Sequence, residues 1–231
     1  PVSANEWILL GSNARHPGRV LDLAVQRING LHNHNLNGGP PSPVFTHFVQ
    51  LYDRLRLAGV LDIAQAPGTG SEVNYFWYIH DYKDAHGDSV RELLKLIGIK
   101  AKLNGSAIIL PLHETVGSST SAVHIKARSA WEVLRIFGDG IAIPPAHLEA
   151  GIVEPLKSAV TEEKRFIMIR SSEKRPDDAT VRIRFRDRWF YIDATDTRSK
   201  RAFGLLRTFI GMRLADPATA HKAPVLTVPV K

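Results

Sequence analysis

Residues 180–214 read TVRIRFRDRWFYIDATDTRSKRAFGLLRTFIGMRL, and this stretch decides the fold. In its first part Val181, Ile183 and Phe185 alternate with arginines, which is the period-two pattern of a strand with one buried and one wet face. Asp187 and Arg188 interrupt the alternation, and an aromatic, β-branched run resumes it up to residue 193. The stretch therefore predicts an antiparallel hairpin over 180–194. Its turn lacks Gly and Asn, so its type stays undefined.

A helix is expected over 197–214, directly after the hairpin. Its apolar residues recur at spacings of three and four: Phe203, Leu206, Ile210 and Leu214. Asp196 or Thr197 is placed to cap the free amides at its start. An alternative is a metal or acid-base site formed by Asp193, Asp196 and Tyr191. We prefer the cap, because aspartate is a favoured N-cap residue and no second ligand cluster is visible.

The positive charge of the chain is concentrated in its C-terminal part. The whole chain of 231 residues has a net charge of +7. Residues 164–213 hold fourteen basic and six acidic residues, so this segment carries +8 and the remainder −1. The 44% hydrophobic and 23% charged content are ordinary for a soluble globular protein. The basic character therefore belongs to the C-terminal part.

The arginines and aromatic residues of the hairpin and of the following helix are the candidate binding residues. They are Arg182, Arg184, Arg186, Arg188, Trp189, Tyr191, Arg198 and Arg201. Guanidinium groups offer forked donors to phosphates, lipid headgroups or acidic partners, and aromatic rings can stack on single-stranded nucleic acid. The alternative is a solvated sheet face whose arginines pair with carboxylates and prevent edge aggregation.

Catalytic and metal-binding patterns are thin. The absence of cysteine excludes disulfides, thiolate zinc sites and cysteine nucleophiles. His32 and His34 lie in an Asn-rich loop, where their spacing is weak evidence for a metal. His80-Asp81 with Asp84 and His86 form a polar cluster after an aromatic strand, for which a turn is the simpler account. We therefore assign no catalytic residue, metal or cofactor.

The rest of the chain predicts an α+β fold, in which a mixed or antiparallel sheet has helices on one face. Residues 1–121 are expected to form a helix-rich part and residues 122–231 an α+β, split βαβ-like part, or both form one continuous domain. Helices are expected from 3, 43, 88 and 129, and over 20–28, where a strand also fits. Strands are expected at 60–64, 73–80, 106–113, 123–128, 165–170 and 225–228.

No apolar run reaches the roughly twenty residues of a membrane span, and no signal peptide stands at the start. The sequence opens with Pro1 rather than Met. We therefore expect a processed or trimmed protein, from which any targeting segment would have been removed.

The chain resembles a family of uncharacterised Gram-negative envelope proteins, often predicted lipoproteins. The resemblance is carried by VQRINGLHN (25–33), RSAWEVL (128–134), IPPAHLEAGIV (143–153), WFYIDATDTRSKRAFGLL (189–206) and PVLTVPV (224–230). In that family the hairpin turn often carries Gly and the strand-helix junction further acids, whereas this chain has Asp187-Arg188 and Asp193-Ala194. The resemblance implies a periplasmic location and a lipidated upstream segment that this chain does not contain. It implies no activity.

Two classes of function remain. The first is a non-enzymatic, envelope-associated binding or assembly module whose C-terminal sheet meets a protein or anionic partner, with oligomerisation also possible. The second is a nucleic-acid or polyanion-binding protein that uses the same surface. An enzyme is a third class, kept open by Tyr191, Asp193, Asp196 and the His80/His86 cluster. We favour the first class.

Overall fold

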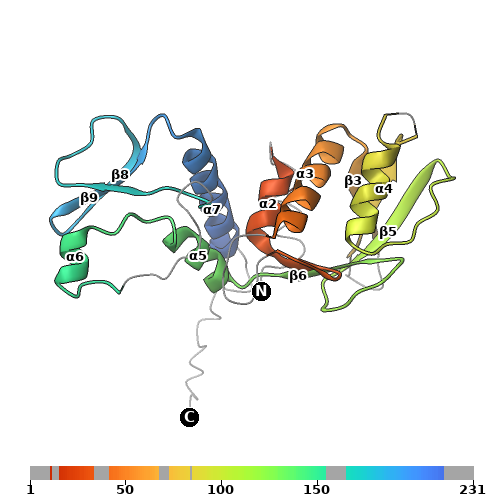
Figure 1. Cartoon of the computed structure of the whole chain (residues 1–231), viewed down its shortest axis with the longest axis horizontal. Coiled ribbons are helices and arrows are strands. Elements are labelled where there is room, and N and C mark those ends of the chain that lie inside the picture. Colours follow the sequence, from red (N-terminus) through yellow and green to blue (C-terminus); the bar gives the residue numbers. More distant parts are fainter. Residues whose placement is uncertain are drawn as a thin grey trace, which may run out of the picture.

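The computed structural model describes residues 11, 16–33, 42–67, 73–83, 85–154 and 165–215. Figure 1 shows two groups of elements that lie side by side. The N-terminal unit holds the elements from α2 to β6, and the C-terminal unit holds those from α5 to α7. Each unit combines a sheet with helices, so the expected α+β class is confirmed.

A six-stranded sheet in the order β2-β1-β6-β5-β4-β3 forms the base of the N-terminal unit. The strands are β1 (Val25–Ile28), β2 (Leu31–His32), β3 (Leu61–Pro67), β4 (Val73–His80), β5 (Ala107–His113) and β6 (Val123–Ala127). Strand β6 pairs in parallel with β5, and the other neighbours pair antiparallel. Although β6 follows residue 121, it completes the sheet of this unit.

Three helices cover one face of this sheet: α2 (Pro17–Ala24), α3 (Pro43–Leu57) and α4 (Gly87–Leu96). Helix α3 begins where Ser42 Oγ accepts a hydrogen bond from the Phe45 amide at 3.1 Å. Phe48 and Tyr52 of α3 pack against Trp77 of β4, with ring centroids 6.4 and 5.6 Å apart. These fully buried rings form the centre of the core.

The C-terminal unit contains a three-stranded antiparallel sheet in the order β7-β9-β8. Its elements are α5 (Ala130–Gly138), α6 (Pro145–Glu149), β7 (Arg170–Ser172), β8 (Ala179–Phe185), β9 (Arg188–Asp193) and α7 (Thr197–Ala215). A capping box between Ser129 and Glu132 starts α5 as expected. Ile192 of β9 and Ala202 and Phe209 of α7 are buried in the core.

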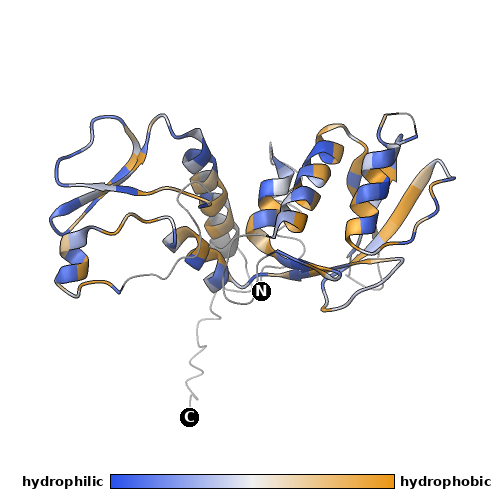
Figure 2. Cartoon of the chain, viewed as in Figure 1, coloured by the Kyte–Doolittle hydropathy of each residue, from blue (hydrophilic) through white to orange (hydrophobic). Residues whose placement is uncertain are grey.

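The two units touch through polar and aromatic contacts. Arg19 of α2 donates to the Phe166 carbonyl at 3.2 Å, and its guanidinium lies 4.7 Å from the centroid of the Phe166 ring. Arg201 of α7 lies 3.2 Å from the imidazole of His16. Figure 2 shows how the hydrophobic residues are distributed, with strand β5 mostly hydrophobic and the helices mixed.

Two expected elements are corrected. Residues 20–28 are not one helix, because α2 ends at Ala24 and the chain continues as strand β1. The strand expected over 165–170 is absent except at its end, because the Met168 amide donates to Ser199 Oγ and Ile169 forms a single bridge to Ile141. The structure adds the short β2 and α6. The helix expected from residue 3 and the strand at 225–228 lie outside the described residues.

Candidate functional site

The predicted hairpin is present, with β8 and β9 paired from Ala179↔Asp193 to Phe185↔Arg188. At its turn Arg186 has a φ of 55°, a left-handed conformation that Gly, Asn or Asp adopt more easily. The next residue, Asp187, accepts a hydrogen bond from Nε2 of the buried His147 of α6 at 3.0 Å. This bond anchors the tip of the hairpin on α6.

One face of the three-stranded sheet brings arginines and aromatic rings together. The central strand β9 presents Tyr191, whose register partners are Arg170 on β7 and Arg182 on β8. Two residues earlier it presents Trp189, whose partner on β8 is Arg184. Side chains directly opposite one another lie on the same face of a sheet. We call this set the arginine face: Arg170, Arg182, Arg184, Trp189 and Tyr191.

A further guanidinium approaches the arginine face from the loop after β7. The Arg175 guanidinium carbon lies 5.9 Å from the ring centroid of Trp189, which is within cation–π distance. Tyr191 is therefore flanked by two cations, and Trp189 also has one beside it and one over its ring.

Among the described residues, no carboxylate lies within ion-pair distance of Arg170, Arg182 or Arg184. Arg182 donates to the carbonyl oxygens of Pro176 and Asp177 at 3.0 and 3.3 Å. These carbonyls orient the guanidinium without cancelling its charge. The ion pairing expected for a solvated arginine face is thus absent at these three arginines.

The other predicted binding residues lie elsewhere. Arg188 is on the opposite face of the sheet and forms an ion pair with Glu173 at 2.9 Å. Arg186 sits at the turn, with its guanidinium 5.7 Å from the Phe185 ring. Arg198 and Arg201 belong to α7, and Arg201 contacts the N-terminal unit through His16.

Sequence reasoning missed Arg170 and Arg175 as members of this surface. Arg170 ended an expected strand, but nothing local shows that this strand pairs with β9. Arg175 lies in a loop whose conformation no pattern predicts.

The opposite face of the hairpin is less buried than its alternation predicts. Ile192 is buried and Val181 packs against the core. Towards the turn, however, Ile183 and Phe185 are 61% and 50% exposed. The expected buried face is thus confined to the end of the hairpin that lies near α7.

The two carboxylates at the strand-helix junction serve local structure. Asp193 accepts hydrogen bonds from the amide and hydroxyl of Thr195 at 2.8 and 2.6 Å, and these bonds lower its pKa. Asp196 accepts from the amide and hydroxyl of Ser199 at 2.9 and 2.6 Å, which confirms the predicted cap. Burial opposes the charge of Asp196, but the bonds from Ser199 outweigh it and lower its pKa.

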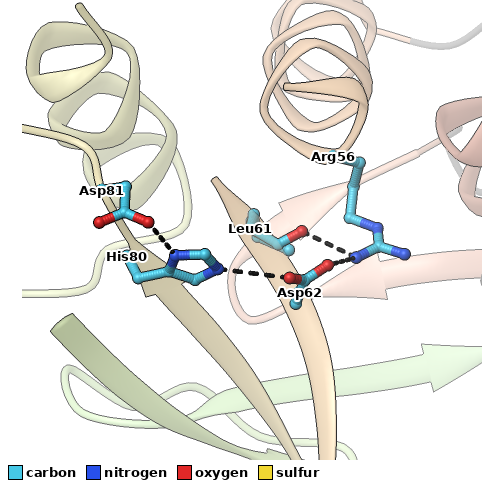
Figure 3. A network of polar contacts seen from close by, with 5 residues as sticks. All are labelled: Arg56, Leu61, Asp62, His80 and Asp81. Atoms are coloured by element: carbon cyan, nitrogen blue, oxygen red, sulfur yellow. Dashed lines mark hydrogen bonds and ion pairs between the residues drawn. The ribbon is translucent and has the colours of Figure 1, made fainter. Parts of the chain in front are cut away.

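A polar cluster surrounds His80 at the end of β4 (Figure 3). Its Nδ1 lies 2.8 Å from Asp81 and its Nε2 3.3 Å from Asp62. Arg56 of α3 donates to Asp62 at 2.6 Å and to the Leu61 carbonyl at 2.8 Å. The hydrogen bonds to Asp81 and then to Asp62 raise the pKa of His80.

This arrangement favours an imidazolium. When His80 is protonated, both of its ring nitrogens can donate to these carboxylates, which only accept. The cluster links α3, β3 and β4. The sequence also suggested Asp84 and His86 as members of this cluster. Asp84 lies outside the described residues, and His86 precedes α4 without a side-chain cap bond.

The remaining histidine hypothesis concerned His32 and His34. His32 lies on β2 and is exposed, whereas His34 is outside the described residues. Within the described ranges there is no group of three or more His, Asp or Glu side chains able to hold a metal ion.

Comparisons with protein-family models, with curated proteins and with solved structures give no match to this chain. Among the helices of the described part, none has the length and apolar character needed to cross a bilayer.

Proposed function

We propose that this chain is a non-enzymatic binding module that holds an anionic polymer on its arginine face. The observation that carries the proposal is the register of the three-stranded sheet, which sets Arg170 and Arg182 on either side of Tyr191 and Arg184 beside Trp189. Alternating cations and flat rings on one solvent-facing sheet match a polymer with regularly spaced anionic groups.

Electrostatics favour such a ligand. Among the described residues no carboxylate forms an ion pair with Arg170, Arg182 or Arg184, although Asp193 interacts electrostatically with Arg170. Gathering like charges on one face costs stability, because charges of one sign repel. An anionic polymer removes this repulsion and releases its own condensed counterions on binding. The same groups therefore gain most from a polyanion and little from a neutral ligand.

The non-enzymatic part of the proposal is supported by what the nearby titratable groups do. Asp193 and Asp196 hold a turn and a helix cap, and His147 and Asp187 hold the hairpin tip. His80 lies within hydrogen-bond distance of Asp81 and Asp62. We assign each of these groups to the structural contact that it makes.

The envelope location is a second part of the proposal, and it rests on the sequence resemblance alone. In this part of the proposal the protein lies at the periplasmic face of a membrane and is anchored through a lipidated segment upstream of residue 1. The genomic start of the reading frame tests it. A signal sequence that ends in a lipidated Cys supports the location, and a cytosolic start without one contradicts it. The charge argument for the ligand does not depend on this outcome.

The test of the binding face compares two charge-matched variants. The first replaces Arg170, Arg182 and Arg184 by Gln. The control replaces three exposed helical arginines by Gln: Arg54, Arg135 and Arg207. Fluorescence anisotropy with a labelled oligonucleotide, and competition with heparin, give the affinities at fixed salt. We expect the first variant to lose affinity for both probes while the control keeps most of it. Equal losses would show that overall charge, not this face, governs binding.

A further inference from the structure

The N-terminal unit has a second open sheet face, on the side away from α2, α3 and α4. Because strand side chains alternate, Trp77 and Ile79 of β4 face the helices, and Phe76 and Tyr78 face outward. The outward register partners of these two rings on β5 are Pro111 and Ile109. Tyr78 is 36% exposed and Ile109 61% exposed. We call this surface the outer face.

The outer face repeats the local design of the arginine face. Residues 76–79 read Phe-Trp-Tyr-Ile and residues 189–192 read Trp-Phe-Tyr-Ile. In both strands the isoleucine is buried, and the first and third residues present two rings to the other side of the sheet. Two rings at alternate positions of one strand are about 7 Å apart. The Tyr78 ring already stacks on the His80 imidazole, with centroids 4.8 Å apart, so Phe76 and the remaining face of Tyr78 are the candidate stacking platforms.

Cations stand on the same outer face, on the strands beyond β5. They are Arg27 of β1 and Lys126 of β6, which are register partners. Among the described residues neither Arg27 nor Lys126 forms an ion pair. Like charges directly opposite one another destabilise a sheet. A bound anion would offset this repulsion.

The acidic groups near the outer face are already engaged. Asp62 and Asp81 lie at the β3–β4 end and are bonded to His80 and Arg56 (Figure 3). Glu132 interacts electrostatically with Lys126. The outer face therefore carries a bonded polar cluster at one end, aromatic rings in the middle, and Arg27 and Lys126 at the other end.

We infer that the outer face binds single-stranded nucleic acid that crosses the strands, with bases stacked on Phe76 and Tyr78 and phosphates held by Arg27 and Lys126. From β4 to β1 the strands span about 14 Å, and the register also displaces Lys126 along the sheet from the two rings, so the nucleic acid would cross the strands diagonally. Stacking is tolerant of base identity because every base has a flat face. The inference goes beyond the proposed function, because the outer face is a second surface with a test of its own.

The experiment removes the rings and keeps apolar bulk. The test variant is Phe76→Leu with Tyr78→Leu, and Ile109→Ala is a control that removes exposed apolar surface but no ring. Probes are a labelled oligothymidylate of about twelve nucleotides, within the range that sheet platforms bind, and heparin, which has charge but no bases. We expect about tenfold weaker oligonucleotide binding by the double variant. Heparin binding and the control should stay near wild type.

Two results would overturn the inference: oligonucleotide affinity unchanged in the double variant, or equal losses for oligonucleotide and heparin. The triple Gln variant of the arginine face separates this failure from that of the proposed function. If only the arginine-face variant weakens binding, the proposed function stands and the outer face is not a site. If only the ring variant weakens binding, the outer face stands and the arginine face does not. Circular dichroism of each variant checks that it is folded.

Discussion

Replacing Asp196 by Ala tests how the C-terminal unit is held together. Asp196 caps α7 through the Ser199 amide and also accepts a hydrogen bond from the Ser199 hydroxyl. Ser199 is buried, and its hydroxyl oxygen accepts a hydrogen bond from the Met168 amide at 2.8 Å. One carboxylate therefore supports both the start of α7 and the chain segment before β7.

The expected loss follows from these bonds. Removing an N-cap acceptor costs about 1 kcal/mol of unfolding free energy. The buried Ser199 hydroxyl then lacks its acceptor, which adds about 1–2 kcal/mol. We expect Asp196→Ala to destabilise the protein by about 2–3 kcal/mol. Asp196→Asn keeps one acceptor oxygen, so its stability should lie between those of Asp196→Ala and wild type. Asp196 and Ser199 share a hydrogen bond. The double variant should therefore lose about 1 kcal/mol less unfolding free energy than the sum of the losses of the two single variants.

Thermal unfolding followed by circular dichroism measures the effect. For a chain of this size, 2–3 kcal/mol corresponds to a decrease in Tm of about 4–12 °C. A Tm within about 1 °C of wild type, or fully additive losses in the Asp196/Ser199 pair, would refute the assignment of this carboxylate as cap and buried acceptor.

Two further predictions concern pH. The pKa of His80 is raised in the folded protein, so its bonds stabilise fully below the unfolded pKa of about 6.5 and lose this effect as pH rises through the folded pKa. The Tm difference between wild type and His80→Gln should accordingly shrink with rising pH, and growth of the difference would contradict the cluster. The hydrogen bond from His147 lowers the pKa of Asp187, so its contribution is present above the unfolded pKa of about 3.9 and fades as pH falls through the folded pKa. Asp187→Asn should approach wild type in Tm at low pH, and a gap that persists there would rule out this bond as its cause.

Local patterns were enough to predict the hairpin and the helix that follows it. Alternation over 181–193 and the cap at Asp196 depend on near neighbours, and both are present. Residues 20–28 fit both the helix and the strand periodicity. Residues 25–28 form a strand because they pair with β6 in the sheet. Residues 165–170 have strand composition, but their backbone groups bond to Ser199 and to residues 140–142 instead.

In the candidate site too, features that depend on neighbouring residues were predicted, and features that depend on distant strand pairing were not. The rings of β9 and the arginines of β8 were identified from the alternation of the hairpin. Arg170 belongs to the arginine face only because β7 pairs with β9. No local sequence pattern predicts that pairing, because the two strands are distant in the sequence. The exposure of Ile183 and Phe185 likewise depends on α7 covering only one end of the hairpin.

The salt dependence of oligonucleotide binding tests the central claim most directly. If Arg170, Arg182 and Arg184 each neutralise a phosphate, the slope of log K against log salt concentration in wild type should be steeper than in their triple Gln variant by about 2, from about 0.7 for each contact. The Arg54, Arg135 and Arg207 control should keep the wild-type slope. Identical slopes for wild type and the arginine-face variant would show that this face does not hold the polyanion.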